Sequence, residues 1–257
     1  MKIQKTLLAV LSIVAAGSAQ AALIDRGGGL IYDTVLDVTW LQDANYAKTS
    51  LFDGDGKMNW TDANAWAANL SYVDTVRNVT YTDWRLPGVA PVNGSQINRT
   101  TWSGKGETDW GYHISAPGTL YAGSTGSEMA YMYYQNLLNP GLHWANSTTN
   151  TGCYVNAANT CLDNVGPFIN LQTDYAYGSG TTYHPPQGAD QGWVFSMGTG
   201  AQTTYGLTQN NVYAWAVRDG DVASVAAPIP EPETYAMLLA GLGLLGVVAR
   251  RRNRRPS

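Results

Sequence analysis

The placement of apolar and basic runs at both ends constrains this chain most. Residues 1–21 begin with Lys2 and Lys5, continue with an apolar stretch and end in Ala-Gln-Ala, which is the order of a secretory signal peptide. Cleavage between Ala21 and Ala22 would start the mature chain. Only residues between the two ends are therefore expected to form a folded domain.

The C-terminal end has three parts: a proline-flanked glutamate, an uncharged run and a basic cluster. They are Pro230-Glu231-Pro232, residues 235–249, and Arg250, Arg251 and Arg252 with two further arginines. As a helix the run would measure about 22 Å, short of a hydrocarbon layer of about 30 Å, but flanking arginines can extend its reach. We expect a transmembrane helix with the domain on the outer side, because basic residues favour the cytoplasmic side.

This ending resembles the PEP-CTERM sorting signal of exopolysaccharide-producing Gram-negative bacteria. The resemblance implies cleavage near Pro-Glu-Pro by exosortase, a membrane protease. It also implies export through the inner membrane, transient anchoring there, and then a location at the cell surface or outside the cell. We place the sorting signal at 230–257 and a small-residue linker at 223–229.

Composition narrows the class of the domain between these ends. Charged residues make up 13% of the chain and aromatic residues 11%, whereas globular proteins average roughly 25% charged residues. Disordered tails and coiled coils need more charge, so both are excluded. Residues 22–227 contain eight basic and seventeen acidic side chains, a net charge of −9. Nucleic acid is therefore excluded as a partner, since its binding requires a basic surface.

The two cysteines, Cys153 and Cys161, lie close together in the exported part of the chain. In an oxidising compartment this spacing predicts a disulfide that closes a small loop. A zinc site is disfavoured, because there is no second cysteine pair and the histidines lack finger spacing.

Hydrophobic periodicity predicts an α+β domain over residues 22–222. One helix is expected over 61–70 with Thr61 as its cap, and a second from a capping box at 125–128 to a stop at Asn139. The expected strands cover 30–32, 38–41, 192–197 and 212–218. We expect the terminal strands to lie close together.

Six segments resemble, in order, the Lcl C-terminal domain family, a domain of unknown function. They are residues 29–47, 60–70, 83–87, 127–139, 164–172 and 212–221. The resemblance implies a C-type-lectin-like fold, with two short helices on a mixed, mostly antiparallel sheet and long loops that present the site. The Gly-, Ser- and Thr-rich stretch 88–126 departs from the family pattern.

Motifs of common enzyme classes are missing from the sequence. It has no Gly-x-Ser-x-Gly, no His-Glu-x-x-His and no phosphate-binding glycine loop. A formylglycine-generating activity would follow from fold analogy alone, and the cysteine spacing differs. Glu107 and Asp109 could supply the two carboxylates of a glycosidase, which leaves a matrix polysaccharide hydrolase as an alternative.

Calcium is the one candidate cofactor that the sequence indicates. Asp53 and Asp55 lie two residues apart in a glycine-rich turn, which suits a hard cation. The EF-hand pattern fails at Lys57 and Met58, and Asp and Gly also form turns for local reasons. The turn interpretation is favoured, with calcium as the alternative.

The 88–126 stretch offers a candidate carbohydrate-binding surface. Its aromatic and polar residues are Trp102, Glu107, Asp109, Trp110 and Tyr112, followed by His113. Aromatic rings in a polar loop either bind a ligand or anchor the loop. The remaining tryptophans Trp40, Trp66, Trp84, Trp193 and Trp215 are expected in the core. Arg85 and Arg218 are expected to pair with Asp83 or Asp219.

These features predict an exported surface or extracellular-matrix protein. We expect it to be a non-catalytic module that binds glycan or exopolysaccharide. The alternatives are the hydrolase and a purely structural matrix protein without a ligand.

Overall fold

The computed structural model describes residues 23–142, 153, 160–209 and 211–222. The chain divides into two units, Met1–Asp221 and Val222–Ser257. All described helices and strands belong to the first unit.

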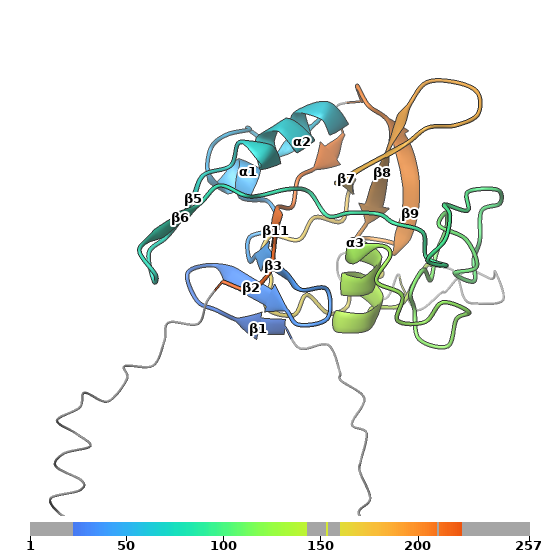
Figure 1. Ribbon diagram of the computed structural model, residues 1–257, viewed down its shortest axis with the longest axis horizontal. Helices are drawn as coiled ribbons and strands as arrows, with labels where there is room; N and C mark the ends of the chain where they lie inside the picture. Colours follow the sequence, from blue (N-terminus) through green and yellow to red (C-terminus); the bar gives the residue numbers. More distant parts are fainter. Residues whose placement is uncertain (1–22, 143–152, 154–159, 210, 223–257) are drawn as a thin grey trace, which may run out of the picture. The chain divides into compact units, whose positions relative to one another are not determined.

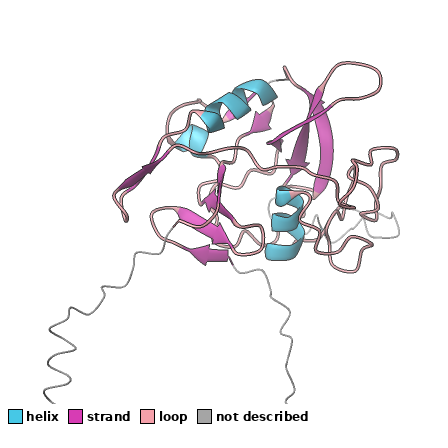
Figure 2. Ribbon diagram, in the orientation of Figure 1, coloured by secondary structure: helices cyan, strands magenta, loops and turns pink. Residues whose placement is uncertain are grey.

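Short strands and helices make up this unit (Figures 1 and 2). The strands are β1 (Leu23–Asp25), β2 (Leu30–Asp33), β3 (Val38–Leu41), β4 (Lys57–Met58), β5 (Tyr72–Asp74), β6 (Val79–Tyr81), β7 (Ala176–Tyr183), β8 (Gln191–Ser196), β9 (Ala201–Gly206), β10 (Val212–Tyr213) and β11 (Val217–Asp219). The helices are α1 (Tyr46–Thr49), α2 (Trp60–Ala68), α3 (Glu128–Tyr131) and the π-helix η1 (Met132–Asn136).

The strands form two main sheets and a hairpin. One sheet has the order β1-β2-β3-β11 and is antiparallel throughout. The other has the order β4-β10-β7-β8-β9 and is mixed, because β10 runs parallel to β7. The β5–β6 hairpin projects at the left of Figure 1. The first and last strands share one sheet, so the prediction that they lie close together is confirmed.

The expected strand over 212–218 is divided between the two sheets. β10 pairs with β7, whereas β11 pairs with β3. The intervening Trp215 is fully buried, packs 4.5 Å from the Trp40 ring and donates its indole N–H to the Leu41 carbonyl at 2.7 Å. The five tryptophans assigned to the core are all buried, which confirms that prediction.

Helix α2 matches its expected position but not its expected cap. Asn59, in an extended conformation, accepts the Asp62 N–H at 2.8 Å, and Thr61 lies inside the helix. An N-cap residue needs a non-helical backbone, which Asn59 has and Thr61 does not. Ala63, Trp66 and Ala67 provide the buried face.

The second expected helix is shorter and less regular than its pattern indicated. Its cap is Ser127, not Thr125, and α3 continues directly into η1. The wider π turn buries both Tyr133 and Tyr134, which a regular amphipathic stripe would not predict. With α1 included, the domain has more helical segments than the two that the sequence indicated.

A corner of ion pairs joins α3 to the four-stranded sheet. Arg85 donates to Glu128 at 2.7 and 2.8 Å and to Asp219 at 2.6 Å. Arg218 donates to Asp83 at 3.0 and 2.8 Å. The expected pairing of these two arginines is confirmed.

Candidate functional site

The candidate site lies in the long loop between β6 and α3, which is attached to the five-stranded sheet. Gly111 exchanges backbone hydrogen bonds with Gln202 of β9, at 3.0 and 2.8 Å. Gly111 has φ +138°, and a Cβ there would collide with the Ser103 backbone. Only glycine therefore permits this close approach.

Asp109 anchors the loop internally. Its carboxylate accepts the N–H groups of Val92 at 2.7 Å and Asn98 at 2.6 Å, and its carbonyl accepts the Gln202 amide at 2.8 Å. The side chain is 1% exposed. Burial raises the pKa of Asp109, although the two N–H donors act in the opposite direction.

Trp102 is the exposed ring of this loop. It is 39% exposed and lies edge-on to Trp110 at 5.2 Å and to Tyr112 at 5.3 Å. Trp110 is half-buried and donates its indole N–H to Thr203 of β9 at 3.1 Å. These contacts hold an exposed aromatic ring in a defined orientation.

Arg99 and Tyr183 complete the surface. The Arg99 guanidinium carbon lies 4.5 Å from the Trp110 ring centroid and 4.8 Å from that of Tyr183, at the end of β7. We call Arg99, Trp102, Trp110 and Tyr183 the aromatic patch. Sequence reasoning missed Arg99 and Tyr183, because nothing in the linear pattern brings the end of β7 to this loop.

The predicted ligand-contacting residues separate into two groups. Trp102, Trp110 and Glu107 reach the surface, whereas Asp109 and Tyr112 are buried beneath it. Asp109 and Tyr112 therefore position the loop in this structure. Glu107 and Asp109 do not form an exposed carboxylate pair of the kind that a glycosidase uses.

The carboxylates of Asp53 and Asp55 already have partners within their own turn. Asp53 accepts the N–H groups of Asp55 at 3.0 Å and Gly56 at 2.7 Å. Asp55 accepts the Lys57 N–H at 3.0 Å and pairs with the Lys57 ammonium at 3.4 Å. The Lys57 N–H, chiefly, lowers the pKa of Asp55. The residues that the structure describes contain no cluster of three or more His, Cys, Asp or Glu side chains able to hold a metal.

Two hollows accompany these regions. A cavity of about 600 Å³ lies beside α2 and is lined by Phe52, Asp53, Met58 and Trp66, among others. A shallow groove of about 590 Å³ runs between residues 90–94 and 121–126 of the long loop. The rings of the aromatic patch line neither this cavity nor this groove.

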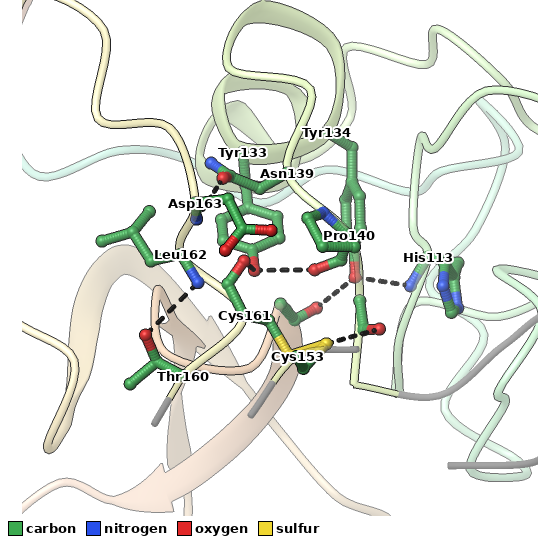
Figure 3. Close-up of a disulfide and its surroundings, with 12 residues drawn as sticks. His113, Tyr133, Tyr134, Asn139, Pro140, Cys153, Thr160, Cys161, Leu162 and Asp163 are labelled. Atoms are coloured by element: carbon green, nitrogen blue, oxygen red, sulfur yellow. Dashed lines mark hydrogen bonds between the residues drawn. A yellow bond between two sulfur atoms is a disulfide. The ribbon is translucent and has the colours of Figure 1, made fainter. Parts of the chain in front are cut away.

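The Cys153–Cys161 disulfide forms as predicted, beside the buried tyrosines of η1 (Figure 3). Tyr133 donates its hydroxyl to the carbonyls of Pro140 at 2.8 Å and Cys161 at 3.0 Å. Tyr134 accepts the His113 N–H at 2.9 Å and donates to the Gly200 carbonyl at 2.8 Å. The disulfide and the long loop are thus both tied to η1.

Comparison with known proteins identifies the C-terminal segment. Residues 228–255 match the family described as the PEP-CTERM protein-sorting motif. This motif indicates an exported protein that is targeted to an exosortase and held transiently in the membrane before its release to the surface. No curated protein and no solved structure matches the chain.

The predicted processing sites lie outside the described residues. These are Ala21, Ala22, Pro230, Glu231, Pro232, Arg250, Arg251 and Arg252, together with the apolar run 235–249. Within the part that the structure describes, no helix has the length and apolar character needed to cross a bilayer.

Proposed function

We propose that this exported protein is a non-catalytic glycan-binding module of the cell surface or extracellular matrix, and that the aromatic patch is its binding surface. The observation that carries the proposal is the exposed Trp102, which Trp110 and Tyr112 support edge-on. Aromatic faces pack against the C–H groups of sugar rings, and a ring already held in place loses little entropy on binding.

The sorting motif supports the proposed location of the binding partner. The motif indicates a protein that is exported and released to the cell surface, where extracellular polysaccharide is the partner that we propose. The mixed sheet, the shared sheet of the first and last strands and the long loop between β6 and α3 are also compatible with the C-type-lectin-like fold that the family resemblance implies. That fold assignment stays a prediction.

The test is binding of the exported protein to a glycan array and to extracellular polysaccharide, with Trp102→Ala as the principal variant. We expect at least a tenfold loss of affinity with the unfolding midpoint nearly unchanged, since Trp102 is partly exposed. Phe52→Ala is the matched control, because Phe52 is a 64% exposed ring outside the patch. Wild-type affinity in Trp102→Ala, or no glycan bound by the wild type, would overturn the proposal.

A further inference from the structure

The arginines of the domain share a pattern with one exception. The structure describes five of them, and four form ion pairs with carboxylates. The pairs are Arg26 with Asp221, Arg77 with Asp74, Arg85 with Glu128 and Asp219, and Arg218 with Asp83. In a domain with a net charge of −9, an arginine readily finds a carboxylate.

Arg99 is the exception. Within the described residues it has neither an ion pair nor a hydrogen bond, and its Nε is buried without an acceptor. The residues outside the description contain only two acidic side chains, Glu231 and Glu233, both in the sorting motif. The chain between 143 and 159, which includes most of the undescribed part of the domain, contains no acidic residue.

An unpaired guanidinium in this setting is costly. A buried donor without an acceptor loses its hydration, and a charged donor loses more than a neutral one. The rings of Trp110 and Tyr183 offset part of this cost through cation–π contact and restrict the guanidinium plane. They supply no hydrogen-bond acceptor, so within the described residues the buried Arg99 Nε has no partner from the chain.

Two of the four arginines that pair with carboxylates also lie over an aromatic ring. They can therefore be compared directly with Arg99. Arg26 lies 5.3 Å from the Tyr32 centroid and Arg218 lies 4.4 Å from the Tyr81 centroid. Each of them also has a carboxylate partner from the chain. At Arg99 the rings are present, but no residue that the structure describes supplies a carboxylate.

We propose that the missing partner comes from the ligand: Arg99 binds the carboxylate of a uronic acid residue, beside the ring that packs on Trp102. This inference rests on the proposed function of the patch. The planar fork of a guanidinium matches a carboxylate through two parallel hydrogen bonds, as Arg85 does with Glu128 in this domain. Because the domain itself is acidic, short oligosaccharides bind with less long-range repulsion than densely charged polymers.

The experiment uses an array of short oligosaccharides in matched sets, with the same backbone carrying uronic acids, their carboxyl-reduced neutral forms or sulfate esters. The exported protein is compared with Arg99→Gln and with Arg218→Gln, which removes a ring-stacked arginine elsewhere. We expect the wild type and Arg218→Gln to bind the uronic acid members at least tenfold more tightly than the neutral ones. We expect Arg99→Gln to bind both forms with the same affinity.

The outcomes separate the two proposals. Equal binding of acidic and neutral members by the wild type, a preference for sulfate esters, or a uronic acid preference that survives in Arg99→Gln would overturn the inference about Arg99. In each of these cases a loss of binding in Trp102→Ala would leave the glycan-binding function standing. If the wild type binds no member of the array, both proposals fail.

Discussion

Two regions of this domain place an arginine over aromatic rings, and they differ in one respect. At the corner between β6 and β11, Arg218 lies over Tyr81 and donates two hydrogen bonds to Asp83. In the aromatic patch, Arg99 lies between Trp110 and Tyr183 and has no carboxylate from the described chain. The stacking is similar, but the charge is neutralised in only one of them.

The difference shows how a structural arginine can be told from one that is available to a ligand. Arg218 and its neighbour Arg85 connect segments distant in sequence, so their hydrogen bonds contribute to folding. Within the described part of the chain, the Arg99 side chain connects no segments through hydrogen bonds. Its removal is expected to affect binding, whereas removal of the corner arginines is expected to affect stability.

The largest effect on stability is expected at Arg85. Arg85→Gln leaves the largely buried Glu128 carboxylate with the Gly88 N–H, at 2.6 Å, as its remaining strong partner. We expect a loss of about 3 kcal/mol in the free energy of unfolding, measured by urea denaturation. Arg99→Gln should lose less than about 1 kcal/mol, the value of its ring contacts. Equal losses in the two variants would remove the distinction between the regions.

The pH dependence of stability sharpens the comparison further. The Arg218 hydrogen bonds, chiefly, lower the pKa of Asp83. The contribution of the pair is therefore fully present above the usual aspartate pKa of about 4 and is lost as the pH falls through the lower, folded-state pKa. Between about pH 7 and pH 2, the free energy of unfolding should fall less in Arg218→Gln than in the wild type. Arg99→Gln should retain the wild-type decline, and a parallel change in both variants would contradict this expectation.

The smallest effect is expected from calcium. Because Asp53 and Asp55 already accept backbone N–H groups and Asp55 pairs with Lys57, we expect calcium titration to give no heat beyond that of the double variant Asp53→Asn, Asp55→Asn. Calorimetry of the exported protein measures this. A calcium-dependent rise in the unfolding midpoint that the double variant lacks would instead establish the calcium site.

Local patterns predicted the elements that depend on local chemistry. The strands over 30–32 and 38–41, the helix over 61–70 and the core tryptophans followed from alternation and helical spacing. The break at Trp215 did not, because an unbroken apolar run contains no information about which sheet each half joins. The π turn of η1 was missed because the capping box and the apolar spacing of this segment are those of a regular α-helix.

Only the part of the candidate site that depends on residues close in sequence was predicted. Trp102 and Trp110 stood out because they are close in sequence, and they do lie together. Asp109 had the character of a ligand-binding carboxylate, but the loop uses it to bind Val92 and Asn98. Arg99 gave no signal in the sequence, because its position depends on contact between the long loop and the end of β7.

The sequence by itself determined the sorting motif and the acidic, ring-rich character of the domain, because a sorting signal is recognised as a linear segment and net charge does not depend on conformation. Only the tertiary structure decided which charges are neutralised and which rings remain exposed. Arg99, Trp110 and Tyr183 meet because the long loop packs against β7 and β9, and contacts between such distant segments exist only in the folded chain.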